Sequence, residues 1–380
     1  METMAEWFGL REGRRDFYVE NQADARLLFA RTELNQRLMS VLKRSFRTGN
    51  PPKLVLYGDW GVGKTHTMRH MQHVIETTPD YSAEIIFVEL PDITSKTDFQ
   101  AAHSALLDAL GIDRVKNWVS QFQARNPNAM QELQDWTQSG DIAKAFSTLI
   151  GYGEAARIAW DWLRGIKLSA GDARSAGLPP SLDQSLHMVH VLKATGRLAS
   201  EIENAMLVLM LDEATKLQNV TNGDAIAHWV NAFKILSDDR TKETGLVVSI
   251  SIPDIEEFPA PLRDLQVVTR FGQDHYIDLP NFHEDEAREF TSALLAEWVD
   301  DAKKVAITSA HQAETDSEDV GQKFPFTDAA FDRFLTYVCR GVITTPRDIQ
   351  KTLDDFLNRA IDEDRHILSS DFVESLIVGA

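Results

Sequence analysis

The stretch GDWGVGKT, residues 58–65, decides the fold, because its Gly-x-x-x-x-Gly-Lys-Thr spacing is that of a phosphate-binding loop, the Walker A motif. Such a loop folds backbone N–H groups around phosphate oxygens, while its lysine bridges the β and γ phosphates and its hydroxyl holds Mg²⁺. The alternative is an ordinary glycine-rich turn. We expect nucleotide phosphates to be bound, with Thr65 as a metal ligand, by Gly58, Asp59, Trp60, Gly61, Val62, Gly63, Lys64, Thr65 and His66.

The sequence on both sides of this loop favours the phosphate-binding interpretation. KLVLY (53–57) reads as a short buried strand, and apolar residues at 68, 71, 74 and 75 mark one face of a helix that ends near Pro79. Strand, loop and helix therefore follow one another in the order that a phosphate loop requires.

Composition narrows the class of protein. The 380 residues, 43% of them apolar, suggest two or three structural units with ample core. Cys339 is the only cysteine, which excludes an intramolecular disulfide, and we see no signal peptide or membrane-length apolar run. We therefore expect a cytoplasmic protein that does not engage a membrane.

Charge bears on nucleic acid as a partner. The formal charge of −19, from 39 basic and 58 acidic side chains, opposes non-specific adhesion of the whole molecule to nucleic acid. Basic residues of the first segment could still contact nucleic-acid phosphates as a local patch. The alternative is that they form a solvated helix face. Its members are Arg37, Lys43, Arg44, Arg47 and Lys53.

Four further apolar runs read as buried strands: EIIFVEL (84–90), AMLVLML (205–211), LVVSISI (246–252) and HYIDL (275–279). Helical patterns alternate with these strands, which predicts an α/β fold with a five-stranded, mostly parallel sheet covered on both faces. Ligands of such sheets bind at the carboxyl ends of the strands.

The tract 112–200 carries four tryptophans and no strong strand, so we predict a helical insertion. We expect its tryptophans to pack in a core rather than stack on bases. The polar stretch SAGDARSAGLPPS (169–181) is expected to be a mobile loop.

A second motif follows the third predicted strand, which runs straight into Asp212 and Glu213 as a Walker B motif does. We expect Asp212 to bind Mg²⁺ through its water shell and Glu213 to orient or deprotonate the attacking water. The alternative is a strand that meets two solvated acids. His187, His190 and the HEDE sequence (283–286) are read as structural, because acids in a first helical turn favour the helix dipole.

We expect three parts along the chain. They are an N-terminal helical segment (1–50), an α/β core (51–280) that includes the insertion before Walker B, and a helical lid (281–380) with an acidic loop at 314–319.

With these motifs in order, the chain resembles the AAA+ ATPases, particularly the origin-recognition and initiator-type clade, over nearly its full length. FARTEL (29–34) resembles the adenine-side box, with Ala30 in place of the usual glycine. VTRF (268–271) resembles the arginine-finger box, which implies that Arg270 faces a neighbouring subunit. TPRDI (345–349) resembles the second sensor, which implies that Arg347 contacts the γ phosphate. Without the resemblance, Arg270 would be interpreted as a surface arginine and Arg347 as a member of an ion pair on a helix face.

The first sensor of this clade is usually a polar residue, often asparagine, at the end of the fourth strand. Here Ile252 and Pro253 follow Ser-Ile-Ser, which leaves Ser251 or Ser249 as substitutes, and Ser251 is taken as the candidate.

Two departures from the AAA+ pattern narrow the choice of subfamily. The insertion is longer than usual and no winged-helix DNA reader fits, which argues against a replication initiator. DWLRG (161–165) is similar to initiator-like ATPases of bacterial phage-defence systems, while Pro253-Asp254 is similar to AAA+ regulators of transposition.

The resemblance implies an ATPase that binds and hydrolyses MgATP to drive assembly of a homo-oligomer with shared ATP sites and to recruit a protein effector. A low-turnover ATP-gated scaffold and a DNA-associated regulator are the alternatives.

Overall fold

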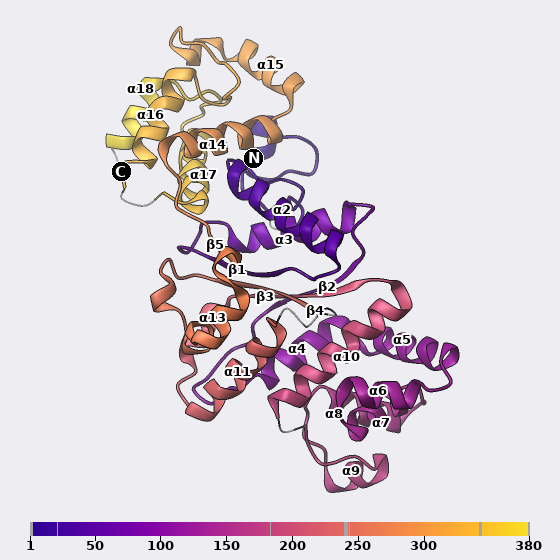
Figure 1. The fold of residues 1–380 in the computed structure, drawn as a ribbon. Helices are drawn as coiled ribbons and strands as arrows, with labels where there is room; N and C mark the ends of the chain where they lie inside the picture. The colour runs from indigo at the N-terminus through magenta and orange to yellow at the C-terminus, as the bar shows by residue number, and fades with distance from the viewer. Residues whose placement is uncertain are drawn as a thin grey trace. The chain divides into compact units, whose positions relative to one another are not determined.

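The computed structural model describes residues 3–20, 22–182, 184–238, 242, 244–341 and 344–378. Five parallel strands form one sheet in the order β2-β3-β4-β1-β5 (Figure 1). Their bounds are β1 (Lys53–Tyr57), β2 (Ala83–Glu89), β3 (Met206–Asp212), β4 (Thr244–Ile250) and β5 (Tyr276–Asp278). The predicted α/β fold with a five-stranded parallel sheet is therefore confirmed.

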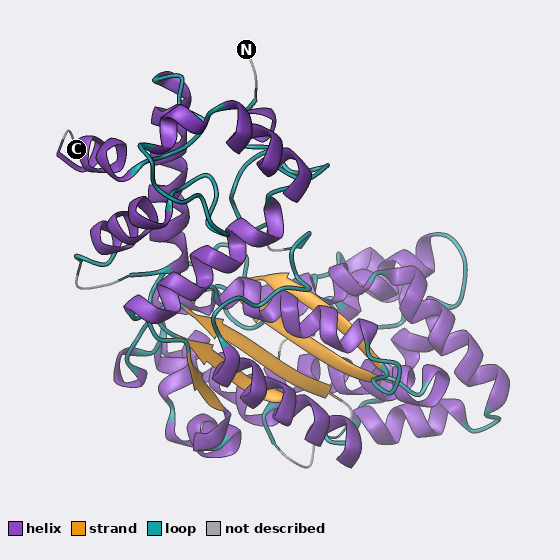
Figure 2. Cartoon of the chain, turned by 90° about the horizontal axis from the view of Figure 1, so that it is seen from above, coloured by secondary structure: helices purple, strands orange, loops and turns teal. Residues whose placement is uncertain are grey.

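The inner strands are buried on both faces, as the continuous apolar runs required. All seven residues of β4 are buried, and so are six of the seven in β3. Helices cover both faces of the sheet (Figure 2), so each strand offers side chains to a core on either side. The helices that connect or follow the strands are α3 (Lys64–Thr77), α4 (Gln100–Leu110), α10 (Ser185–Glu203), α11 (Gly223–Leu236), α12 (Ala260–Arg263) and α13 (Leu265–Phe271).

The tract before β3 is a helical insertion, as predicted. It contains α5 (Ile112–Arg125), α6 (Ala129–Thr137), α7 (Gly140–Leu149), α8 (Glu154–Leu163) and α9 (Ala170–Ala176), followed by α10. Trp118, Trp160 and Trp162 are buried in its core, and Trp136 packs against that core while partly exposed. The packing interpretation of these tryptophans is confirmed.

Helix α9 corrects one prediction, because it occupies the stretch expected to be a mobile loop. The Ser169 hydroxyl accepts the Asp172 N–H at 3.1 Å, and Gly177 ends the helix in the left-handed region with φ of 59°. A serine N-cap and a glycine C-cap thus hold a short helix that the polar composition concealed.

Helix α2 (Thr32–Thr48) lies within the segment expected to be helical. Helix α15 (Asp301–Ala310) was not predicted, since none of its residues is buried and no apolar stripe marks it.

Contacts divide the chain into two compact units. The sheet unit comprises residues 37–58 and 68–278, and the helical unit comprises 1–36, 59–67 and 279–380. The helical unit contains α1 (Met4–Trp7), α14 (Glu284–Trp298), α15, α16 (Asp328–Val338), α17 (Pro346–Asp362) and α18 (Ser370–Val378). Short segments of 3-10 helix occur at Ala214–Asn219, Ile255–Glu257, Gln273–His275 and Gln312–Thr315.

The helical unit joins the two ends of the chain. Phe8, Leu10 and Phe17 are buried in one core with Trp298 and Phe290, and Leu10 forms an antiparallel bridge with Val299. The N-terminal segment therefore packs with the C-terminal helices. The division at residues 50 and 280 that we expected from the motifs stays a prediction. None of the helices in the described ranges has the length and hydropathy needed to span a membrane.

Candidate functional site

The candidate phosphate loop lies directly between β1 and the first residue of α3, Lys64. Gly61 and Gly63 have φ of 90° and 95°, which residues with a Cβ atom rarely adopt. Lys64 is 6% exposed, and its ammonium donates to the carbonyl oxygen of Asp59 at 2.6 Å. The positive φ angles of these glycines thus turn the loop so that the Lys64 side chain contacts the backbone of the loop at Asp59.

Two other residues of the helical unit form hydrogen bonds with this loop. Arg31, which is 6% exposed, donates to the Val62 carbonyl at 3.2 Å, and its guanidinium lies 4.5 Å from the centre of the Phe282 ring. The Asn281 amide donates to the Asp59 carboxylate at 2.5 Å. Sequence reasoning missed both residues, because these contacts span 31 and 222 positions of the chain.

Ala30 precedes Arg31 in the adenine-side box and stands where the family usually has glycine. Its φ is 50°, in the left-handed region, and its side chain is 7% exposed. A residue with a Cβ is strained by about 1–2 kcal/mol in this conformation. Ala30 therefore adopts a backbone conformation that glycine would adopt without strain.

Arg347 reaches the loop from the start of α17. The cap residue Thr345 accepts the Asp348 N–H at 3.2 Å, and the Asp348 carboxylate accepts the Thr345 N–H in return. A Cβ on Gly61 would lie 2.9 Å from the Thr345 hydroxyl and 3.1 Å from the Arg347 Cβ. Glycine at this position is what permits the close approach of α17 to the loop.

The second motif ends β3 in the sheet unit. Asp212 is 4% exposed, and its carboxylate accepts the Ser249 hydroxyl and, at 3.0 Å, the N–H of Glu213. Glu213 follows with φ of 58°, a conformation that costs a non-glycine residue energy and is found at functional sites. The turn after β3 thus holds Asp212 buried and leaves Glu213 partly exposed.

Ser249, rather than the preferred Ser251, contacts this motif. Its side chain is 1% exposed, and its oxygen also accepts the Glu213 N–H at 3.2 Å. Ser251 lies past the end of β4, where its N–H donates to the Thr215 hydroxyl at 2.7 Å. The sheet register, which pairs Val248 with Leu211, explains this arrangement because it sets the following residues, Ser249 and Asp212, side by side. The choice between the two serines thus depends on how β3 and β4 pair, which the sequence of either strand alone does not show.

Arg270 lies in the last turn of α13, one residue before its end at Phe271. Its Nε is 3.5 Å from a carboxylate oxygen of Asp238, and the arginine side chain is 30% exposed. Leu265, at the start of the same helix, is 77% exposed.

One group in the helical unit has the composition of a metal site. Ligand atoms of His311, Glu314 and His366 lie within 4.8 Å of one another. The two imidazole rings, however, are stacked with centroids 3.7 Å apart and an interplanar angle of 19°, so their lone pairs run side by side instead of converging on one cation. Burial opposes ionisation of Glu314, but N–H groups of Ile367 and His366 lower its pKa nonetheless. The group is a hydrogen-bonded cluster.

The histidines set aside from metal binding have structural contacts. His283 and Glu286 form a capping box at the start of α14, as the dipole argument predicted. The Nδ1 atom of His190 lies 2.7 Å from the Thr137 carbonyl oxygen.

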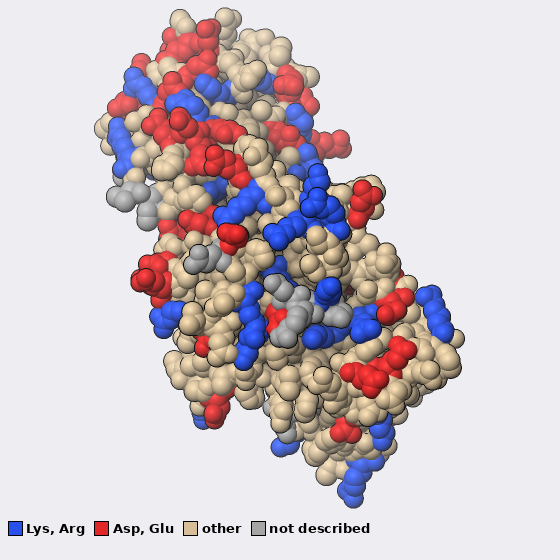
Figure 3. Space-filling view, in the orientation of Figure 1, with Lys and Arg blue, Asp and Glu red and all other residues tan. Residues whose placement is uncertain are grey.

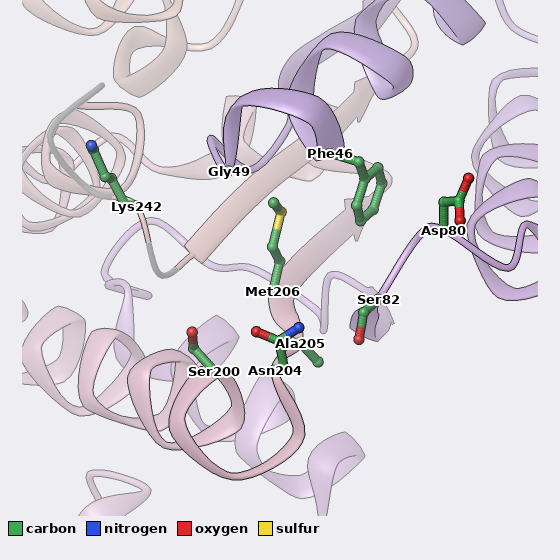
Figure 4. A pocket seen from close by; sticks show the side chains of 9 residues that line it. All are labelled: Phe46, Gly49, Asp80, Ser82, Ser200, Asn204, Ala205, Met206 and Lys242. Atoms are coloured by element: carbon green, nitrogen blue, oxygen red, sulfur yellow. The ribbon is translucent and has the colours of Figure 1, made fainter.

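A pocket of about 280 Å³ opens at the amino-terminal ends of β2 and β3 (Figure 4). Met206, the first residue of β3, lines it, whereas Asp212 is the last residue of that strand. The pocket is therefore separate from the Walker B motif. Its lining is Phe46, Gly49, Asp80, Ser82, Ser200, Asn204, Ala205, Met206 and Lys242.

Comparison with known proteins agrees with the fold and the loop. The family model described as the KAP family P-loop domain matches residues 32–235. No curated protein matches the chain. Among solved structures, the Aeropyrum pernix ORC2 protein in ADPNP–ADP complexes has a TM-score of 0.53 at 14% identity, covering 98% of this chain and 72% of that one.

Two other structures are similar at lower TM-scores. The Aeropyrum pernix ORC1 protein in complex with DNA has 0.49 at 12% identity, covering 95% of this chain and 68% of that one. The Thermotoga maritima RuvB Holliday junction branch migration motor has 0.43 at 13% identity, covering 91% and 68%. At 14% identity, the likeness to the ORC2 protein concerns the fold alone.

Proposed function

The chain belongs to the KAP family of P-loop NTPases, and from that premise we propose that it is an ATPase that binds MgATP at residues 58–65. The observation that carries the proposal is the glycine-rich loop between β1 and α3, with positive φ at Gly61 and Gly63 and a nearly buried lysine. A loop of this form directs N–H groups and one cation at phosphate oxygens.

The proposed roles follow from the chemistry of each side chain. Lys64 would bind the β and γ phosphates, and Thr65 and Asp212 would hold Mg²⁺, which would neutralise charge on the phosphate oxygens during hydrolysis. Glu213 accepts the proton of the attacking water. Of the two candidate serines, Ser251 and Ser249, we propose Ser249 as the first-sensor residue, because its hydroxyl donates to Asp212.

Arg347 is proposed to contact the terminal phosphate of ATP. The close approach of Thr345 and Arg347 to Gly61 supports this role, since it brings the start of α17 against the phosphate loop. An arginine at this place adds hydrogen-bond donors that a diphosphate cannot fully use.

We further propose that the active form is a homo-oligomer in which Arg270 completes the ATP site of a neighbouring subunit. The resemblance of VTRF (268–271) to the arginine-finger box supports this proposal, and the Arg270 side chain on α13 is 30% exposed. Recruitment of a protein effector in a cytoplasmic phage-defence system is the setting suggested by the DWLRG phrase, which ends α8.

The test of ATP binding is Lys64→Ala in the full chain. Removing the ammonium leaves phosphate charge uncompensated, so titration with a fluorescent ATP analogue should detect no binding at concentrations that saturate the wild type. Lys167→Ala, which removes an exposed lysine of the sheet unit, is the matched control and should bind normally. Unchanged affinity of Lys64→Ala would show that residues 58–65 are not the nucleotide site.

A second candidate function, a DNA-associated regulator, is favoured by the charge of one segment. Residues 34–58 contain five basic and no acidic side chains in a chain of net charge −19. Lys43, Arg44 and Arg47 are exposed on α2, and none forms an ion pair within the described residues. Figure 3 shows basic side chains gathered over this helix.

Salt dependence separates the two functions. If duplex DNA binds along α2, fluorescence anisotropy should give a steep dependence of affinity on salt, and changing Lys43, Arg44 and Arg47 to serine should reduce the slope by up to about 3. A protein-recruiting ATPase should show little DNA affinity at physiological salt, and the triple variant should not change it.

A further inference from the structure

Trp60 is an unusual residue for a phosphate loop because its large apolar side chain is exposed. It is 63% exposed, and the Cζ atom of Arg347 lies 3.7 Å from the centre of its indole ring. Both residues belong to the helical unit. The contact is thus a close cation–π stack between the loop and the start of α17.

The stack leaves the hydrogen-bonding edge of the arginine available. Within the described part of the chain, the Arg347 guanidinium makes no hydrogen bond or ion pair with protein, and the side chain is exposed. A guanidinium that lies on a ring through its face keeps its five N–H donors in its own plane, directed away from the ring. Trp60 therefore restrains the cation without using the groups that bind an anion.

The backbone on both sides of the stack is fixed. Pro346 begins α17 and Thr345 caps it through the capping box with Asp348. A Cβ on Gly61, the residue next to Trp60, would lie 2.9 Å from the Thr345 hydroxyl and 3.1 Å from the Arg347 Cβ, so the two segments pack closely. With the backbone held, only the torsions of the long arginine side chain remain to be ordered when an anion binds, and that ordering costs free energy unless the side chain is already restrained.

We propose that Trp60 is a positioning residue that holds Arg347 ready for the terminal phosphate of ATP. The proposal rests on the proposed ATPase function and deepens it, by assigning the discrimination between ATP and ADP to an arginine–tryptophan pair. A cation–π contact at an exposed site corresponds to a change of about two- to fivefold in a binding constant. The indole of Trp60 should contribute that factor to triphosphate affinity and nothing to diphosphate affinity.

The experiment measures the Kd of a non-hydrolysable ATP analogue and of ADP for four proteins: wild type, Trp60→Leu, Arg347→Met and the double variant. Trp60→Leu should raise the Kd of the triphosphate analogue about two- to fivefold and leave that of ADP unchanged. In the Arg347→Met background, Trp60→Leu should have no further effect, because the cation that it restrains is gone. Trp60→Phe, which keeps a ring face, should stay close to wild type.

The matched control is Tyr152→Leu. Tyr152 is 92% exposed and lies 4.4 Å from the Lys116 ammonium, so it is also an exposed aromatic ring on a cation, but it belongs to the insertion. This variant should bind both nucleotides as the wild type does.

Three results would overturn the proposal. These are an equal effect of Trp60→Leu on both nucleotides, an effect that persists in the Arg347→Met background, and no effect at all. If Arg347→Met itself leaves the ratio of the two Kd values unchanged, the role of Arg347 is wrong as well. Failure of the ATPase proposal is recognised separately, by nucleotide binding that survives Lys64→Ala.

Discussion

His103 links α4 to the insertion through a hydrogen bond that acid should break. It lies fully buried on α4, and its Nε2 is 2.7 Å from the carbonyl oxygen of Leu163, the last residue of α8. Within the described residues its Nδ1 has no hydrogen-bond partner. Nε2 therefore carries the proton of a neutral ring, and a second proton on Nδ1 would be a buried, unpaired charge.

The size of the effect follows from the pKa. Burial lowers the pKa of His103 from 6.5 to about 4, although the bond to Leu163 opposes this change. Because the folded-state pKa is the lower one, the unfolded chain takes up the proton first as the pH falls below 6.5, and stability is lost between that pH and about 4. At about 1.36 kcal/mol per pH unit the full loss is about 3 kcal/mol, and the loss at pH 5 is about 2 kcal/mol.

The assay compares wild type with His103→Gln, whose amide can donate to the Leu163 carbonyl but does not titrate. Urea unfolding at pH 7.5 and pH 5, followed by tryptophan fluorescence, should show that the wild type loses about 2 kcal/mol more than the variant. Parallel losses in the two proteins would refute the reasoning, because they would assign the acid sensitivity to other groups.

Three further substitutions test other parts of the account. Ser249→Ala should lower the free energy of unfolding by about 1–3 kcal/mol, because the buried Asp212 carboxylate loses a donor; a value within error of the wild type in urea unfolding would contradict the contact. Ala30→Gly should raise it by about 0.5–1 kcal/mol, since relief of left-handed strain exceeds the entropic cost of glycine, and destabilisation would refute this. Arg270→Ala should bind ATP but hydrolyse it about 10³–10⁵ times more slowly, and mixing it with Lys64→Ala should restore activity. A mixture that stays inactive although mixed oligomers form would exclude action of Arg270 in trans.

The sequence predicted the inner strands well because the side chains on both of their faces are buried in apolar surroundings. The run from Leu207 to Leu211 is apolar throughout, and a strand buried on both faces needs nothing else. The motif residues also follow their predicted strands, as Asp212 ends β3 and Gly58 follows β1. Both inferences use only neighbours along the chain.

What the sequence did not predict depends on pairing over long separations. The choice of Ser249 over Ser251 requires the register between β3 and β4. The stack of Arg347 on Trp60 joins residues that are far apart in the chain, and neither alone suggests it. Helix α9 was missed for a different reason, since only Ala173 and Ala176 are buried in it and no apolar stripe results.

The central claim is that this chain hydrolyses ATP with Glu213 as the base, and single-turnover hydrolysis by Glu213→Gln tests it most directly. The variant keeps the size and hydrogen bonding of the side chain but cannot accept the proton, so we predict wild-type affinity for ATP and almost no release of phosphate. Glu257→Gln, which changes an exposed acid of the same unit, should hydrolyse ATP at the wild-type rate. Hydrolysis by Glu213→Gln at the wild-type rate would contradict the account.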